Sequence, residues 1–333
     1  MASRGGQISE DGAEPDEALD CFDTRTEIEC GTGRFAVYTA GFDGGMESSA
    51  ILVLLHGAGC AACSWALCAR ALKNRYRIIA MDLRGHGATV CAEEDDDLSL
   101  PTLHADLLLV LQHVIPRDRD DAPPLVLVGH SMGAALAVHA AAQAQETVQG
   151  PLQGALQNVR AVVLVEASEG AAKEAFANTE AFLANRPTRF KDSMSAVEWA
   201  LASGLLCNRE SARVSIPPTL APARHGEDDG FFLWRTAMDT TREHWAGWFE
   251  GMSRSFLALK GCGKLVIVAH TDSLDKDLMV GQMQGLFQVQ VVPTHAALGT
   301  AVADPGRHAH FVHEDYPDFV ANAIGCFLKR QNL

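Results

Sequence analysis

A serine lies two positions from a glycine on each side in the pentapeptide GHSMG, residues 129–133. An apolar run precedes the pentapeptide and an alanine-rich stretch with helical character follows it. A sharp turn between a strand and a helix needs small residues at both flanking positions, and it exposes the serine hydroxyl at the helix N-terminus, where negative charge is favoured. The pattern therefore predicts that Ser131 is the nucleophile of an acyl-transfer reaction.

A second glycine-rich stretch, LHGAG at residues 55–59, ends an earlier apolar run. In hydrolases with such a serine turn, a loop at this place supplies one backbone N–H to the oxyanion, and the residue after the nucleophile supplies the other. The predicted donors are the N–H groups of Ala58 and Met132. A third motif, DLRGHG at residues 82–87, follows the next apolar run, and we interpret it as structural.

A histidine must accept the proton of Ser131, because neutral imidazole titrates in the required range. In hydrolases of this kind the base follows the last strand, close to the C-terminus. Four histidines lie there: His295, His308, His310 and His313. We favour His310, because its segment runs directly into a predicted terminal helix at residues 318–329.

A carboxylate must orient the imidazole and stabilise its charged form. The chain order serine, acid, histidine leaves two positions. Glu166 ends the apolar run 161–165, and Asp272 follows the apolar run 265–269. The second position is the more usual one in this type of enzyme, so the residues alone favour Asp272.

Alternating strand and helix patterns must position these residues. Six apolar, β-branched runs predict buried strands, at 51–55, 77–81, 125–128, 161–165, 265–269 and 287–292. Helical patterns are found at 64–72, 102–114 and 132–143. Such alternation predicts a mostly parallel central sheet flanked by helices. With residues 27–30 and 34–39 as an antiparallel edge hairpin and Ser131 in its turn, the pattern predicts an α/β-hydrolase fold.

The alternation stops in the middle of the chain. Residues 168–263 contain helical patterns but no run strong enough for the sheet, which predicts an inserted helical cap with a mobile, Pro- and Gly-rich loop at 217–230. Residues 21–167 and 264–333 are then the two parts of the hydrolase core. Residues 1–20 are acidic and lack periodicity, so we expect a disordered tail.

The composition of the chain argues against nucleic-acid binding, membrane insertion and secretion. The 333 residues are 47% hydrophobic and carry a formal net charge of −15, which gives no electrostatic footprint for nucleic acid or an anionic membrane. No apolar run is long enough to span a bilayer, and the first residues lack the apolar core of a secretion signal. The nine cysteines are interpreted as reduced thiols of a cytoplasmic or nuclear protein, not a secreted one. Cys60 and Cys63 have no second ligand pair, so we predict no metal site.

Several motifs along the chain, taken together, are more specific than the serine turn alone. They comprise GHSMG at 129–133, EG at 169–170, RP at 186–187 with FK at 190–191, AVEW at 196–199, NRESARVS at 208–215, WAGWF at 245–249, LDKDL at 274–278, GQMQG at 281–285 and HED at 313–315. In this order, over residues 22–330, they closely resemble the protein phosphatase methylesterase family. The resemblance includes the cap, where general α/β-hydrolases share nothing.

The resemblance implies removal of the methyl ester from the C-terminal leucine of the protein phosphatase type 2A catalytic subunit, which is then the partner, with no cofactor. It also implies an acid directly after the run 161–165, which matches Glu166, although the family has aspartate there. The chain departs further at Ala58 and Ala134, where glycine is usual, and in a longer segment at 294–307. A small-molecule esterase of the same fold and a catalytically impaired phosphatase-binding regulator are the alternative functions.

Overall fold

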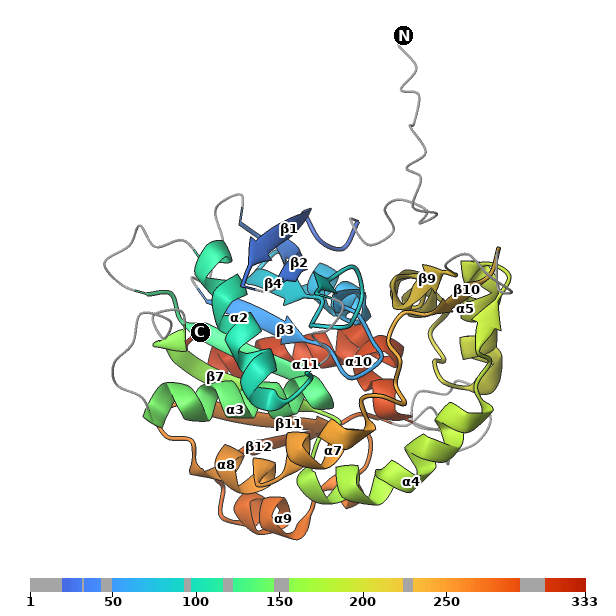
Figure 1. Ribbon diagram of the computed structural model, residues 1–333. Coiled ribbons are helices and arrows are strands. Elements are labelled where there is room, and N and C mark those ends of the chain that lie inside the picture. Colours follow the sequence, from blue (N-terminus) through green and yellow to red (C-terminus); the bar gives the residue numbers. More distant parts are fainter. Residues whose placement is uncertain are drawn as a thin grey trace.

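A mostly parallel sheet runs through the centre of the molecule (Figure 1). The computed structural model describes residues 20–31, 33–42, 50–92, 97–115, 122–146, 156–223, 230–293 and 309–333. Within these residues the strands are β1 (Thr24–Cys30), β2 (Gly33–Ala40), β3 (Ile51–Leu55), β4 (Arg77–Met81), β5 (Val90–Cys91), β6 (Leu125–His130), β7 (Val159–Val165), β11 (Gly263–Val268) and β12 (Gln288–Val291). Their order is β1-β2-β4-β3-β6-β7-β11-β12, and β5 pairs with β2.

The pairing follows the sequence pattern. Strands β4, β3, β6, β7, β11 and β12 pair in parallel, and their central members are continuous apolar runs because helices cover both faces. The predicted edge hairpin is β1 paired antiparallel with β2. Strand β1 is mostly exposed and rich in Thr, Arg and Glu, as suits the outer edge of a sheet.

Helices form a layer on each side of the sheet (Figure 1). One layer contains α2 (Leu100–Val114), α3 (Met132–Glu146), α7 (Arg242–Phe249) and α8 (Met252–Ala258), and its buried side chains join one apolar cluster. The opposite layer contains α1 (Ala66–Leu72), α10 (Val312–Asp315) and α11 (Pro317–Arg330), preceded by the 3₁₀ helix η1 (Ala62–Trp65). Trp65 and Phe327 are fully buried on this second side. The central strands of the sheet are therefore buried on both faces.

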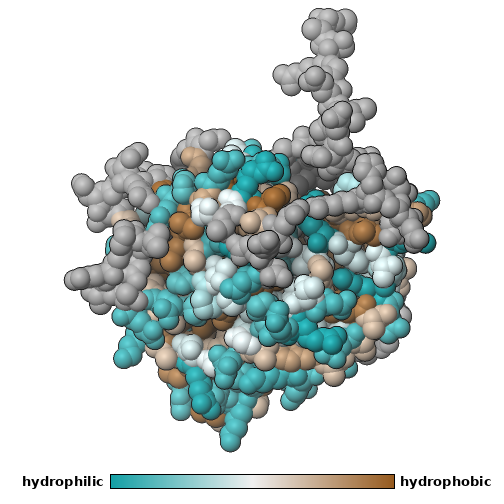
Figure 2. All heavy atoms as spheres, viewed as in Figure 1, coloured by the Kyte–Doolittle hydropathy of each residue, from teal (hydrophilic) through white to brown (hydrophobic). Residues whose placement is uncertain are grey.

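The surface agrees with an acidic, polar chain. In the view of Figure 2, hydrophilic side chains cover most of the described area, and hydrophobic residues are scattered in small groups. The most exposed large apolar side chain among the described residues is Met283, on α9 (Lys276–Met283). No helix in the described ranges is long and apolar enough to cross a membrane.

The segment between β7 and β11 differs in detail from the predicted helical cap. It contains α4 (Glu169–Asn185), α5 (Ser193–Ser203) and α6 (Arg209–Ser215), and also a small antiparallel sheet of β8 (Arg189–Phe190), β10 (Phe232–Trp234) and β9 (Leu220–Pro222). The predicted loop 217–230 begins with a 3₁₀ helix, η3 (Pro217–Thr219), and β9, whereas residues 224–229 lie outside the described ranges. Strands of two or three residues are too short to show a periodic pattern.

Two apolar clusters divide the predicted cap. A small cluster holds α5, α6 and the small sheet together, through Phe190, Ala196, Val197, Ala200, Leu206, Ala212, Ile216 and Leu220. Helices α7 and α8 instead pack on α3 in the main cluster, through Trp245, Trp248, Phe249 and Phe256. The helical layer of the core therefore begins before residue 263, the predicted end of the cap. The predicted tail, residues 1–20, lies outside the described ranges apart from Asp20.

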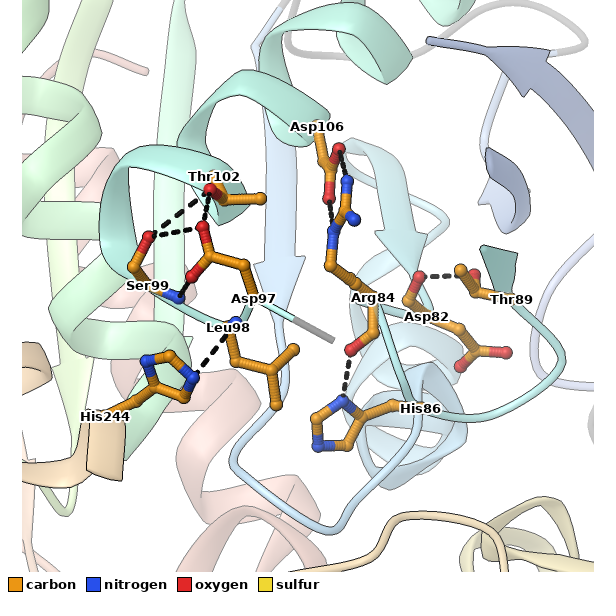
Figure 3. Close-up of polar contacts among 10 residues, drawn as sticks. All are labelled: Asp82, Arg84, His86, Thr89, Asp97, Leu98, Ser99, Thr102, Asp106 and His244. Atoms are coloured by element: carbon orange, nitrogen blue, oxygen red, sulfur yellow. Dashed lines mark hydrogen bonds and ion pairs between the residues drawn. The ribbon is translucent and has the colours of Figure 1, made fainter. Parts of the chain in front are cut away.

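A buried ion pair fastens the loop after β4 to α2 (Figure 3). Arg84 donates through Nε and Nη2 to the two carboxylate oxygens of Asp106, and both distances are 2.8 Å. The two side chains are 4% and 6% exposed. A charge buried this deeply is tolerated only with its partner in place, so each residue depends strongly on the other.

Arg84→Met should lower the free energy of unfolding by about 3–5 kcal/mol, because it leaves the Asp106 carboxylate buried and unpaired. Urea denaturation followed by circular dichroism measures the change. The matched control is Arg70→Met, which removes a surface pair with Glu210 whose side chains are 45% and 59% exposed. The control should lose far less stability. Equal losses in the two variants would contradict the importance of the buried pair.

One histidine of α10 is fully buried and packs against aromatic rings. The His313 side chain is fully buried, and its ring centroid lies 4.4 Å from that of Trp65 and 4.3 Å from that of His130. Within the described part of the chain, neither ring nitrogen of His313 has a hydrogen-bond partner. Burial lowers the pKa of His313 to about 3, helped by the neighbouring His310, so the ring is neutral at physiological pH.

Replacing this ring should change how stability depends on pH. The pKa of His313 is lower in the folded state than its ordinary value of 6.5, so its contribution to stability is present above pH 6.5 and is lost as the pH falls toward 3. In His313→Phe that loss is absent. Relative to the wild type, the free energy of unfolding of the variant should therefore improve by about 1.4 kcal/mol per pH unit below pH 6. Urea unfolding at pH 7.5, 5.5 and 4.5 tests this, and a difference independent of pH would refute it.

Candidate active site

Ser131 lies in the turn between β6 and α3, as the sequence predicts. Its φ is 51°, in the left-handed region. A Cβ at Gly129 would lie 2.2 Å from the carbonyl oxygen of Gly133, and a Cβ at Gly133 would lie 2.3 Å from that of Leu55. Both glycines are therefore required by direct contact between backbones. The Ser131 N–H donates to the carbonyl of Val165 at 3.1 Å, which fixes the turn to β7.

Helix α3 begins directly after the serine. Met132 is its first residue and is buried, whereas Ser131 is partly exposed. The carbonyl of Ser131 accepts the N–H of Ala134 at 2.9 Å. The first N–H groups of a helix have no partner within the helix, and the helix dipole favours negative charge beside them. Met132, one of the two predicted oxyanion donors, carries the first of these N–H groups.

The second predicted donor, Ala58, follows the end of β3 and lies between two glycines. A Cβ at Gly57 would lie 2.6 Å from Nδ1 of His130 and 3.3 Å from Cβ of Ser131. The loop therefore passes directly against the nucleophile turn, and only glycine fits at position 57. A Cβ at Gly59 would lie 3.1 Å from the sulfur of Met238, so a residue of the cap segment covers the other side of the loop.

Asp82 has a structural role, in agreement with our interpretation of its motif. Its carboxylate oxygens accept the N–H groups of Ala62 at 2.7 Å and Ala88 at 2.8 Å, and Gly87 has no room for a Cβ against it. Burial raises the pKa of Asp82 to about 6, and the two backbone hydrogen bonds oppose that rise. The side chain is fully occupied in holding two loops together.

The predicted base, His310, lies beside the nucleophile turn. It belongs to the 3₁₀ helix η5 (Ala309–Phe311) and is exposed. Its carbonyl oxygen accepts a hydrogen bond from Nε2 of His130 at 2.9 Å, and the two ring centroids are 4.7 Å apart. His313 is fully buried, as described above. The other two candidates, His295 and His308, lie outside the described residues.

Glu166 lies one strand away from the nucleophile. It directly follows Val165, the residue whose carbonyl accepts the Ser131 N–H, and β7 pairs with β6. Its φ is 49°, so its backbone is also in the left-handed region. The carboxyl group accepts the N–H of Ala269 at the end of β11. Burial raises the pKa of Glu166 to about 8, partly opposed by this hydrogen bond.

Asp272, the alternative acid, is more remote. It lies in the 3₁₀ helix η4 (Thr271–Ser273) after β11, and its side chain is exposed. Strand β7 separates β11 from β6 in the sheet. The sheet order therefore places Glu166 nearer to Ser131 than Asp272.

Sequence reasoning did not assign a role to His130. The structure places its ring between the glycine loop, the nucleophile turn and the carbonyl of His310. One signal was present: residues 129 and 130 end a buried strand, and successive side chains of a strand point to opposite faces. Gly129 faces α3, so the residue after it must face the opposite layer, from which the base loop comes. Nothing in the sequence alone shows which carbonyl it reaches.

The described residues offer no metal centre. They contain no group of three or more His, Cys, Asp or Glu side chains arranged to hold a metal ion. Burial raises the pKa of the Cys60 and Cys63 thiols well above its ordinary value, which disfavours the thiolate form that binds metals.

Comparison with known proteins extends these observations. Residues 52–323 match the model of the alpha/beta hydrolase family. Protein phosphatase methylesterase 1 of Mus musculus is 35% identical, with 93% of this chain and 82% of the relative covered. The probable protein phosphatase methylesterase 1 of Caenorhabditis elegans is also 35% identical, with 94% and 77% covered.

Solved structures support the fold. An E-2-(acetamidomethylene)succinate hydrolase has a TM-score of 0.66 at 17% identity, with 92% of this chain and 99% of that chain covered. A thioesterase domain from the curacin biosynthetic pathway has a TM-score of 0.61 at 20% identity, with 90% and 98% covered. Together with the serine turn and the relatives that match through the cap, these findings show that the chain is an α/β-hydrolase and belongs to the protein phosphatase methylesterase family.

Proposed function

We propose that this chain is a serine carboxylesterase that removes the methyl ester from the C-terminal leucine of the protein phosphatase type 2A catalytic subunit. The observation that carries the chemistry is the left-handed turn of Ser131, with Gly57 of the oxyanion loop packed against it. The substrate is inferred from the relatives, which are named protein phosphatase methylesterases and match this chain over more than nine-tenths of its length.

The mechanism is acyl transfer through Ser131. His310 accepts the hydroxyl proton as the oxygen attacks the ester carbonyl. The N–H groups of Ala58 and Met132 bind the oxyanion, and each such donor is typically worth a hundred- to thousand-fold in rate, roughly 3 kcal/mol. Methanol leaves after protonation by His310. Water then attacks the acyl-enzyme and releases the leucine carboxylate, and no cofactor takes part.

Glu166 is our choice for the acid that orients His310. It follows the strand next to the nucleophile strand, whereas Asp272 follows the strand beyond. With its pKa raised to about 8, the carboxyl group is mostly protonated at neutral pH in the described arrangement. The ionised form is the one that orients an imidazole, so Glu166 first releases its proton to solvent. The carboxylate then stabilises the imidazolium that forms when His310 accepts the proton of Ser131.

Recognition of the substrate must depend on the partner protein. Methanol is a small leaving group that offers almost no binding area, so selectivity has to come from the peptide tail and the surface of the phosphatase. We expect the cap to make these contacts, because its Met238 lies beside Gly59 of the loop that contains Ala58. All nine cysteines are free thiols, which suits a reducing compartment, and we infer the cytoplasm or nucleus.

The wild-type protein should demethylate purified, methylated phosphatase catalytic subunit, and Ser131→Ala should lower kcat by about 10⁴-fold or more, because no other group replaces the nucleophile. Loss of the methyl group is followed by mass spectrometry of the C-terminal peptide. A fluorophosphonate probe should label the wild type and not the variant.

The same assay separates the alternatives. Retention of the methyl group under all conditions would exclude the proposed activity. Rapid turnover of short-chain nitrophenyl esters together with that result would identify a small-molecule esterase. Failure of the probe to label the wild type would identify a catalytically impaired regulator that binds the phosphatase.

Glu166→Gln should lower kcat by about 10⁴-fold, as expected for loss of the orienting carboxylate, whereas Asp272→Asn should stay within about two-fold of the wild type. Glutamine resembles the protonated form of Glu166, so the variant should fold with an unchanged Tm. Glu166→Asp restores the residue usual in the family and should retain most activity. A large loss in Asp272→Asn with an active Glu166→Gln would reverse the assignment.

A further inference from the structure

Two buried histidines hold the loop that contains Ala58. The N–H of Gly59 donates to Nε2 of His86 at 2.9 Å, and Nδ1 of His86 donates to the carbonyl of Arg84 at 2.7 Å. Figure 3 shows the second bond. A carbonyl can only accept, so Nδ1 of His86 carries the proton and Nε2 presents its lone pair. Burial lowers the pKa of His86 to about 4, so the ring is neutral at physiological pH and can accept from Gly59.

His56 makes the complementary pair of contacts. Its Nδ1 donates to the carbonyl of Gly57 at 2.8 Å, and its Nε2 accepts the N–H of Leu83 at 2.9 Å. The rings of His56 and His86 are fully buried, with their centroids 5.0 Å apart. The peptide units on both sides of Ala58 are therefore tied to the loop that follows β4.

Because the peptide unit is planar, the hydrogen bonds to Gly57 and Gly59 also fix the direction in which the N–H of Ala58 points. The carbonyl of Gly57 and the N–H of Ala58 belong to one planar trans peptide unit and point in opposite directions. The next unit contains the N–H of Gly59, which His86 holds. A glycine on each side makes the loop conformationally permissive, so its orientation depends on such external contacts. The carbonyl of Gly57 has a second contact, since it also accepts the N–H of Cys60 at 3.2 Å. For the N–H of Gly59, the described acceptor is Nε2 of His86.

His86 is itself held rigidly. The backbone carbonyl that it contacts belongs to Arg84, whose side chain forms the buried ion pair with Asp106. From the other side, the hydroxyl of Thr236 donates to the carbonyl of Gly85 at 2.9 Å, and Met238 packs over Gly59. The cap segment therefore covers part of the contact between His86 and Gly59, and the His86 ring is itself fully buried. A hydrogen bond to a buried ring fixes geometry more firmly than a fully exposed one.

We propose that His86 is a positioning residue for the oxyanion hole, which acts through the Gly59 N–H to aim the Ala58 N–H at the developing oxyanion. The proposal rests on the assignment of Ser131 and Ala58 in the proposed function. His86 makes no contact with substrate in this role. Its contribution lies in the transition state, because the oxyanion exists only there and in the tetrahedral intermediates.

His86→Leu keeps an apolar side chain of similar size but leaves the Gly59 N–H without its acceptor. We expect kcat for the demethylation to fall about 10- to 100-fold, less than for removal of a donor, with KM within about three-fold. His86→Gln offers an amide oxygen near the position of Nε2 and should recover most of the loss. The matched control is His104→Leu on α2, a half-buried histidine whose pKa is also lowered to about 4 by burial. It should leave kcat unchanged.

A second measurement separates positioning from a general loss of structure. A peptide boronate that forms a tetrahedral adduct on Ser131 should bind His86→Leu more weakly by the same factor as kcat/KM falls. A peptide amide of the same sequence, which forms no adduct, should bind both proteins equally. Each variant is assayed at least 10 °C below its Tm, so that unfolding does not enter the comparison.

The proposal is overturned if folded His86→Leu keeps wild-type kcat, if boronate and amide lose affinity equally, or if His104→Leu loses as much kcat. If the wild type does not demethylate the phosphatase, the proposed substrate is wrong, but the role of His86 can still be tested. The rate of fluorophosphonate labelling then tests His86, because attack of Ser131 on the probe places negative charge on the phosphoryl oxygen in the same hole. An equal labelling rate in wild type and His86→Leu would also overturn the proposal.

Discussion

Close contact between three stretches of backbone is the constraint on which the rest of the structure depends. Ser131 adopts a left-handed conformation, which costs a non-glycine residue about 1–2 kcal/mol, and the neighbouring backbone holds it there. Gly129 touches Gly133, Gly133 touches the carbonyl of Leu55, and Gly57 touches the ring of His130. A methyl group at Gly129 or Gly133 would collide with backbone, and one at Gly57 would collide with the buried ring of His130. Ser131, the N-terminus of α3 and the loop that contains Ala58 are thus brought together by the absence of side chains.

The parts of the fold that could be predicted are those with a strong local pattern. Strands β3 and β4 have the predicted bounds, because continuous apolar runs are typical of strands buried on both faces. The small sheet of β8, β9 and β10 escaped prediction because its strands have two or three residues each. Helices α7 and α8 have helical patterns, but only three-dimensional packing shows that Trp245 and Phe256 belong to the main core and not to the cap cluster.

The same division applies to the candidate site. Ser131 and the glycine loop were found from local motifs, because steric demands on a turn leave a direct mark on the sequence. Two positions were open for the acid, because Glu166 and Asp272 each follow an apolar strand, and the residues alone favoured Asp272. Sheet order places Glu166 on the strand next to β6, which supports its choice as a proposal, and sheet order arises from pairing between residues far apart in the chain. His310 is exposed and His313 is buried against Trp65 and His130, a difference that depends on long-range packing and that no local pattern shows.

The buried histidine rings around the turn of Ser131 are uncharged, which affects how strongly the site can retain an anionic product. Burial lowers the pKa of His56, His86, His130 and His313, so that all four rings are uncharged near pH 7. Glu166 mostly retains its proton. The proposed substrate is a neutral ester, and its hydrolysis product is a carboxylate. Backbone dipoles that point at one oxygen stabilise the brief oxyanion strongly, because they are already oriented and shielded from water. Neutral rings provide no net positive charge to retain the anionic product, so binding energy is concentrated on the transition state.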